Sequence, residues 1–214
     1  MTGVTMTTEQ HCADRADARR DRIADTVRRL GTQLREDRRE RGPHVADAAW
    51  VDEPFDDWLA MLHEGKPLAR TSMLALAVGM DQTLAVRDAL IVSIVGGADG
   101  ARKAVLMDFA SRPHAPEVCA RMGRLLTAAF TDEHGGLDKA RCRAAVGALK
   151  DMAGIVPERY RVQPLTIMAY VLWWLGKDEA VEYALEALAI DERCSLAAIV
   201  LGAMRRGIYP VWLR

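Results

Sequence analysis

The sequence predicts an all-α protein, a multi-helix bundle that ends in a tetratricopeptide-like helical hairpin. Glycine and proline residues divide the chain into segments of helical length. Within most segments the apolar residues recur at spacings of three and four, which places them on one face of a helix. No segment offers a clear partner strand for a sheet, so the helical interpretation covers the whole chain.

Residues 8–41 form the first expected helix, which is highly charged and stops at Gly42-Pro43. Its apolar side has the helical spacing of four, three and four and consists of Ile23, Val27, Leu30 and Leu34. We expect the second helix to start at Asp52-Glu53-Pro54, because aspartate is a favoured cap and proline suits a first helical turn. This helix ends at Gly65.

The third expected helix is short and runs from Thr71 and Ser72 to about Met80. Residues 83–95 follow, and their apolar stretch Leu90–Val95 is as typical of a buried strand as of a helix. The thirteen-residue length of this segment favours a helix, and the strand stays an open alternative. Further helices are expected at residues 101–110, 116–130 and 137–152.

A longer connection at residues 154–164, which contains Pro157 and Pro164, marks a possible boundary. The chain then divides into a charged amphipathic N-terminal helix, a helical body and a C-terminal hairpin subdomain. These segments are residues 1–43, 44–153 and 154–214.

The C-terminal segment has the clearest helical pattern, with helices expected at residues 165–175, 179–190 and 195–206. The turns between them are short, so neighbouring helices should be antiparallel. One set of residues resembles the turn and second helix of a tetratricopeptide unit: Gly176, Ala180, Tyr183, Ala187 and Asp191. No second copy recurs near a period of 34 residues, which indicates a single hairpin and not a solenoid.

Two blocks resemble the C-terminal helical part of the actinobacterial domain-of-unknown-function family DUF4192. The first is Leu-Ala-Val-Arg-Asp-Ala-Leu at residues 84–90, and the second runs from Ala169 through Gly176 to the ending Gly207-Ile-Tyr-Pro-Val-Trp212. The resemblance covers roughly residues 50–214 and implies a helical fold with an actinobacterial or mobile-element origin. It implies no catalytic residues. The α/β half that opens members of the family has no counterpart here.

Charge and hydropathy exclude several classes of protein. The chain has 29 Lys and Arg against 30 Asp and Glu, a formal net charge of −1 and 50% hydrophobic residues. This composition is too apolar for a disordered chain, and no apolar run reaches the roughly 18 residues of a membrane span. Residues 1–41 carry charges where a secretory signal would be apolar. We therefore expect a cytoplasmic protein without membrane contact.

The N-terminal helix offers two kinds of contact. Residues 14–41 hold ten arginines and seven acidic residues, a net charge of +3. The apolar seam of Ile23, Val27, Leu30 and Leu34 fits packing onto the protein's own body or onto a second copy. Candidate contacts with nucleic acid are Arg19, Arg28, Arg35 and Arg39. The seven carboxylates would repel phosphate, so a general polyanion binder is excluded.

Tyr209 and Trp212 in the C-terminal tail are further candidate partner contacts. They either close the C-terminal subdomain on the helix that carries Trp173 and Trp174, or they form an exposed apolar patch.

Motifs for chemistry are weak. Gly96-Gly97-Ala98-Asp99-Gly100-Ala101-Arg102-Lys103 suggests a phosphate loop, but its spacing fits none of the known patterns, and the alternative is an inter-helix turn. The pair His11-Cys12 supplies only two metal ligands, so no metal and no cofactor are expected. A Cys–His nucleophile would need Cys119 or Cys142 beside a histidine, which the linear sequence does not show.

The leading hypothesis is a non-enzymatic helical protein for protein–protein interaction or assembly, with a protein partner or self-association. Two alternatives stay open. One is a nucleic-acid-associated accessory protein that contacts phosphates through the Arg-rich N-terminal helix, and the other is an enzyme on a helical scaffold.

Overall fold

The computed structural model describes residues 8–133 and 136–213, with side chains from residue 15 onward except residue 16. All regular elements in this part of the chain are helices, which confirms the all-α multi-helix fold. The helices are, in order, α1 (Thr8–Arg41), α2 (Pro43–Glu64), α3 (Arg70–Gln82), α4 (Leu84–Val95), α5 (Gly97–Gly100), α6 (Lys103–Ser111), α7 (Pro116–Thr131), α8 (Lys139–Ile155), the 3-10 helix η1 (Glu158–Arg161), α9 (Val162–Trp174), α10 (Glu179–Ile190), α11 (Ser195–Arg205) and the 3-10 helix η2 (Val211–Leu213).

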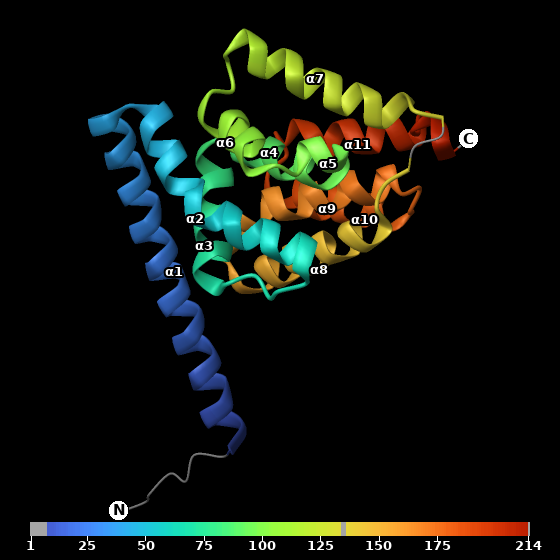
Figure 1. The fold of residues 1–214 in the computed structure, drawn as a ribbon. Helices are drawn as coiled ribbons and strands as arrows, with labels where there is room; N and C mark the ends of the chain where they lie inside the picture. Colours follow the sequence, from blue (N-terminus) through green and yellow to red (C-terminus); the bar gives the residue numbers. More distant parts are fainter. Residues whose placement is uncertain (1–7, 134–135, 214) are drawn as a thin grey trace, which may run out of the picture.

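Helix α9 lies at the centre of the bundle, where it packs against α3, α4, α8, α10 and α11 (Figure 1). Helix α1 runs along one side of the body, against α2 and α3, and its N-terminal end extends beyond them. Helix α7 lies across the top of the body in this view, as an outer helix. In the described residues no helix combines the length and the apolarity that crossing a membrane requires.

Helix α2 begins at Pro43, so the predicted start at Asp52 is wrong. Gly42 turns the chain sharply with a φ of 80°, and Pro43 occupies the first turn of the new helix. Pro54 lies inside α2 and is buried. The earlier start has a packing reason, since Ala46 and Val51 are 2% and 0% exposed and belong to the face that α2 turns inward.

The apolar seam of α1 packs on the protein's own body, which is the first of the two alternatives. Ile23, Val27 and Leu34 are at most 6% exposed, and Leu30 is half-buried. Polar contacts also hold the C-terminal half of α1 against the body. The Nε2 atom of Gln82 donates to the Gly31 carbonyl at 2.7 Å, and Arg38 pairs with Asp47 at 3.2 Å. Burial raises the pKa of Asp47, and the Arg38 guanidinium partly opposes this shift.

The ambiguous segment at residues 90–95 is helical, as the length of its segment favoured. Helix α4 is buried on nearly every face, which is why its sequence lacks a helical period. One polar side chain sits inside it at Ser93. Ser93 Oγ donates to the Leu90 carbonyl at 2.6 Å and accepts from Trp58 Nε1 of α2 at 2.9 Å.

The C-terminal tail packs on the body. Trp173 and Trp174 are 6% and 2% exposed. Trp173 Nε1 donates to the Ile208 carbonyl at 2.8 Å, and Trp212 Nε1 donates to the Ala129 carbonyl of α7 at 3.3 Å. The tail therefore joins α9 to α7. A single cluster of buried side chains draws members from α1, from the helical body and from the C-terminal helices, among them Val27, Leu149 and Leu201.

We expect Ser93→Ala to lower the free energy of unfolding by about 1–3 kcal/mol, because the buried Trp58 Nε1 loses its acceptor. Ser111→Ala is the control, since Ser111 Oγ donates only within its own helix, to Met107. Urea unfolding of both variants measures the difference. Equal losses would show that the Trp58–Ser93 bond contributes nothing specific.

Candidate functional site

Helix α7 is an outer helix that packs on the body mainly through half-buried apolar side chains. In α7 only Val118 is fully buried. At the C-terminal end the Phe130 ring contacts Trp174 edge-on, with ring centroids 5.3 Å apart, and Trp212 bonds to Ala129. The apolar side chains Met122, Leu125 and Leu126 lie half-buried between these points. Space is therefore left on both sides of α7.

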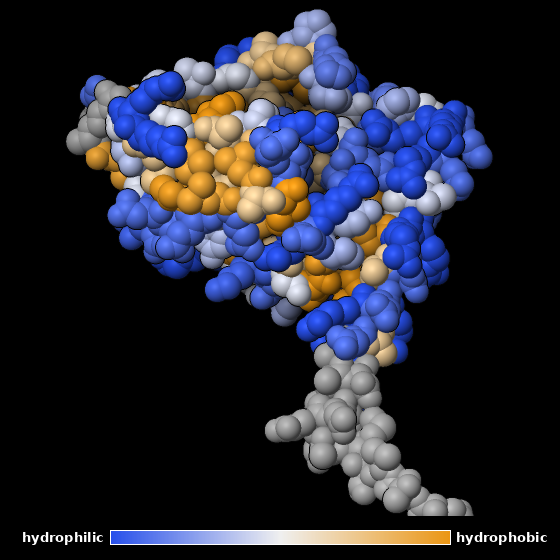
Figure 2. Space-filling view, turned by 180° about the vertical axis from the view of Figure 1, so that it is seen from behind, coloured by the Kyte–Doolittle hydropathy of each residue, from blue (hydrophilic) through white to orange (hydrophobic). Residues whose placement is uncertain are grey.

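The larger space, here called the α7 groove, has a volume of about 650 Å³ and lies between α7 and the start of α4. Most of its lining is apolar. The lining residues are Gln82, Thr83, Leu84, Ala85, Asp88, Phe109, Pro113, His114, Val118, Cys119, Met122, Gly123 and Leu126. Leu84 is 47% exposed at this site. Seen from behind, the surface of the body carries a broad apolar area (Figure 2).

Charges beside the α7 groove are neutralised within the chain. Arg87 is only 8% exposed, and its Nε and Nη2 atoms donate to Asp88 Oδ1 at 2.9 and 2.7 Å. Its Nη1 atom donates to Gln163 at 3.4 Å. An apolar ligand surface with a compensated ion pair at its edge is suited to an uncharged or amphipathic partner.

The α7 groove also brings Cys119 and His114 to one cavity, which the sequence could not show. The thiol of Cys119 donates to the Pro113 carbonyl at 2.9 Å. Cys142 is buried in α8, and burial raises the pKa of its thiol to about 11.

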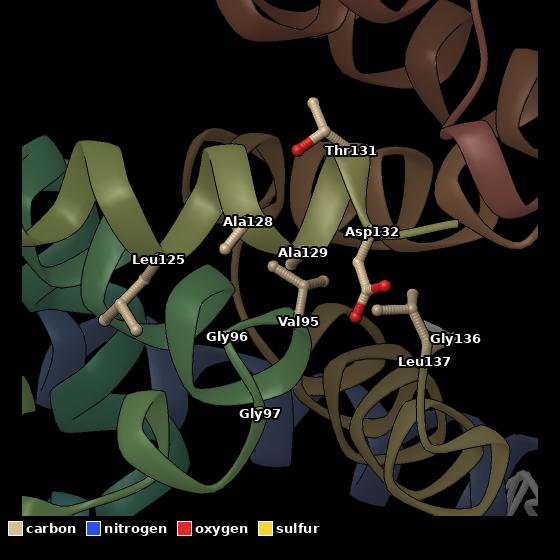
Figure 3. A pocket seen from close by; sticks show the side chains of 10 residues that line it. All are labelled: Val95, Gly96, Gly97, Leu125, Ala128, Ala129, Thr131, Asp132, Gly136 and Leu137. Atoms are coloured by element: carbon tan, nitrogen blue, oxygen red, sulfur yellow. The ribbon is translucent and has the colours of Figure 1, made fainter. Parts of the chain in front are cut away.

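The second space beside α7 lies at the Gly96-Gly97 turn and has a volume of about 460 Å³ (Figure 3). Val95 points toward Ala129 of α7, and the Asp132 carboxylate lies beside Leu137. Arg141 donates to the carbonyls of Ser93 and Gly97, at 3.3 and 3.4 Å. A phosphate loop binds its anion through backbone N–H groups. Here the carbonyls of Ser93 and Gly97 face Arg141, and the Asp132 carboxylate lies in the same space, so this turn is not arranged to bind phosphate.

Lys103 of the suggested phosphate loop points elsewhere. It pairs with Asp52 and Asp56 of α2 at 2.7 and 2.6 Å and thereby joins α6 to α2. The glycines have a steric role, because a Cβ on Gly96 or Gly100 would lie 2.7 or 2.6 Å from the Val92 carbonyl oxygen. The segment is an inter-helix turn, the alternative to the phosphate loop.

The four arginines proposed for nucleic-acid contact are all exposed on α1, but the structure does not bring them together. Arg28 pairs with Asp25, and Arg35 donates to Thr32 Oγ1 at 3.1 Å. Arg19 instead lines a separate cleft with Arg22 and Arg70. The spacing of Arg19 and Arg22 could have shown that they share a face of α1, whereas nothing in the sequence placed Arg70 beside them.

The described residues contain no group of three His, Cys, Asp or Glu side chains that could hold a metal ion. The side chains of His11, Cys12 and His134 lie outside the described residues.

No protein-family model, no curated protein and no solved structure matches the chain. The resemblance to the DUF4192 family therefore stays a prediction based on the residues quoted above.

We expect Gly100→Ala to destabilise the protein by about 2 kcal/mol, because the new methyl group meets a backbone carbonyl that cannot move freely. Gly147→Ala in α8 is the control, since nothing lies within 4 Å of its added Cβ. This variant should gain about 1 kcal/mol from helix propensity. Thermal unfolding measures both changes, and a neutral Gly100→Ala would contradict the steric role of the turn glycines.

Thiol titration tests the assignment of the cysteines. In a Cys12→Ser background at pH 8, the disulfide reagent DTNB should react with exposed Cys119 and not with buried Cys142 or Cys194. The reason is that only an accessible thiolate attacks the reagent, and a pKa near 11 keeps Cys142 protonated at pH 8. All three thiols should react after unfolding. Rapid modification of Cys142 in the native protein would show that α8 is not packed as described.

Proposed function

We propose that this protein is a non-enzymatic helical interaction protein that binds an amphipathic helix of a protein partner in the α7 groove. The observation that carries the proposal is the groove itself, an apolar space of about 650 Å³ with Leu84 47% exposed beside it. Contiguous apolar surface of this kind is costly to leave in water and is typical of sites for a partner.

The shape of the site favours a helix as ligand. Helices α4 and α7 supply opposite walls, and Phe109 of α6 lines the space between them. Helix-lined apolar troughs accept the apolar face of a further helix through side chains at positions i, i+3, i+4 and i+7. In α7 only Val118 is completely buried, so Met122 and Leu126, which line the groove, keep apolar surface for such a ligand.

The proposal includes two expectations from the sequence. The protein acts in the cytoplasm, and the turn at Gly176 with α10 forms a single tetratricopeptide-like unit. The exposure of Ile199 in α11 at 58% and of Leu185 in α10 at 51% supports further protein contacts at this end of the chain. A terminal helix pair that needed no partner would expose mainly polar side chains.

Site-specific photo-crosslinking in the source cells tests the proposal. We expect p-benzoylphenylalanine at position 84 to give a discrete protein adduct, because Leu84 borders the groove. The same residue at position 45 is the matched control, since Val45 is 46% exposed on α2, away from the groove residues. Sedimentation of the purified protein then distinguishes a partner from a second copy.

The substitutions Leu84→Asp and Val45→Asp provide the second half of the test. In both variants crosslinking is measured from position 122. Leu84→Asp places a charge in the interface and should weaken formation of the adduct at least tenfold. Val45→Asp should leave formation of the adduct unchanged. Equal crosslinking from positions 84 and 45, or the same loss in both variants, would refute binding in the α7 groove.

A further inference from the structure

Three arginines from two helices meet at a cleft of about 330 Å³ between α1 and α3. Arg19 and Arg22 of α1 and Arg70 of α3 line it, with Thr26 beside them. The remaining lining residues, Ile23 and Leu74, are each 6% exposed and form an apolar floor. We call this site the arginine cleft.

The three guanidinium groups have no partner of opposite charge in the described part of the chain. Among the described residues, no ion pair and no hydrogen bond involves the guanidinium group of Arg19, Arg22 or Arg70, and all three side chains are exposed. Their neighbours on α1 behave differently, because Arg20 pairs with Asp17 and Arg28 with Asp25. The arginine cleft therefore concentrates positive charge that the rest of α1 neutralises.

The cause is a separation of charges around the first half of α1. At about 100° per residue, Arg15, Arg19 and Arg22 fall on one flank of the buried seam. Asp17, Asp21 and Asp25 follow one another at intervals of four and fall on a different face of the helix, about 130° from the arginines on average. The helix presents its arginine flank toward Arg70, and none of these three carboxylates lines the cleft.

The start of α3 adds to the positive potential. Arg70 is the first residue of α3, and Ala69 at the N-cap offers no side-chain acceptor for the free amide groups. The positive end of the helix dipole therefore lies at the residue that carries the third guanidinium. The carboxylate bonded to this turn, Asp57, accepts from Ser72 Oγ at 2.5 Å and does not line the cleft.

We propose that the arginine cleft binds a phosphate group. Guanidinium groups offer paired N–H donors in a plane that matches phosphate oxygens, and two or three of them around one anion are typical of such sites. The anion relieves the repulsion among the three cations. The Thr26 hydroxyl already donates to the Arg22 carbonyl at 2.8 Å, so the guanidinium groups supply the donors for the anion. The site is separate from the α7 groove, so it does not depend on the proposed protein interaction.

The geometry of α1 favours the backbone of a nucleic acid as the source of the phosphate. Arg15, Arg19 and Arg22 form a ridge that continues from the cleft along the end of α1 that extends beyond the body (Figure 1). A ridge of cations serves a chain of phosphates better than a single one. A free phosphate is the other source of the same chemistry, and the experiment distinguishes the two.

The experiment compares two triple variants of the full chain that lose the same charge. Arg19→Gln/Arg22→Gln/Arg70→Gln removes the cleft, and Arg28→Gln/Arg35→Gln/Arg39→Gln removes three exposed arginines from the rest of α1. Circular dichroism checks that both remain folded. Binding of a fluorescent 20-base-pair DNA duplex is measured by anisotropy at 50 and 200 mM salt, and binding of inorganic phosphate by calorimetry.

We expect the cleft variant to lose at least tenfold in duplex affinity and to reduce the log–log salt dependence by about 2 to 3 units, while the control stays within about threefold of the parent. If only inorganic phosphate binds and only the cleft variant loses it, the source is a free phosphate and the site stands. Equal losses in the two variants would show a simple effect of net charge and overturn the proposal, as would a parent protein that binds neither ligand.

Discussion

The fold depends on the need to surround α9. Trp173 and Trp174 are adjacent and point about 100° apart, so both can be buried only if neighbours cover most of the helix. Their exposures of 6% and 2% show that this condition is met. Thr166 is also fully buried, and its hydroxyl donates a hydrogen bond to the Val162 carbonyl of the same helix at 2.7 Å. The other helices take their places as the cover of this central element.

The cover is unequal, and the candidate site lies where it is thinnest. On one side α4 packs tightly and even places the polar Ser93 in the core, where Trp58 satisfies it. Helix α7, in contrast, packs on the body through half-buried side chains such as Met122 and Leu126, and near its C-terminal end Phe130 contacts the rings of Trp173 and Trp174. These half-buried side chains leave apolar surface uncovered between α7 and the start of α4, and that surface is the α7 groove.

Helix α1 shows how one segment can serve two purposes. The apolar seam of Ile23, Val27 and Leu34 is buried in the core of the same chain. These side chains can therefore contact a second copy only if α1 detaches from the body. The outer surface of α1 remains free, and there the charges divide into an arginine flank and an aspartate flank. A near-neutral total charge is therefore compatible with a local cluster of three unpaired arginines.

The sequence by itself determined the helical class, most helix ends and the seam of α1, because these follow from local spacing and from glycine and proline. It placed the start of α2 wrongly at Asp52, since the burial that holds residues 43–51 in a helix comes from other segments. Only the tertiary structure decided that Gly96 and Gly100 accommodate the Val92 carbonyl, that Lys103 serves α2 and that Arg70 joins Arg19. Each of these is a contact between residues far apart in the chain or on different turns, and such contacts depend on how the helices pack.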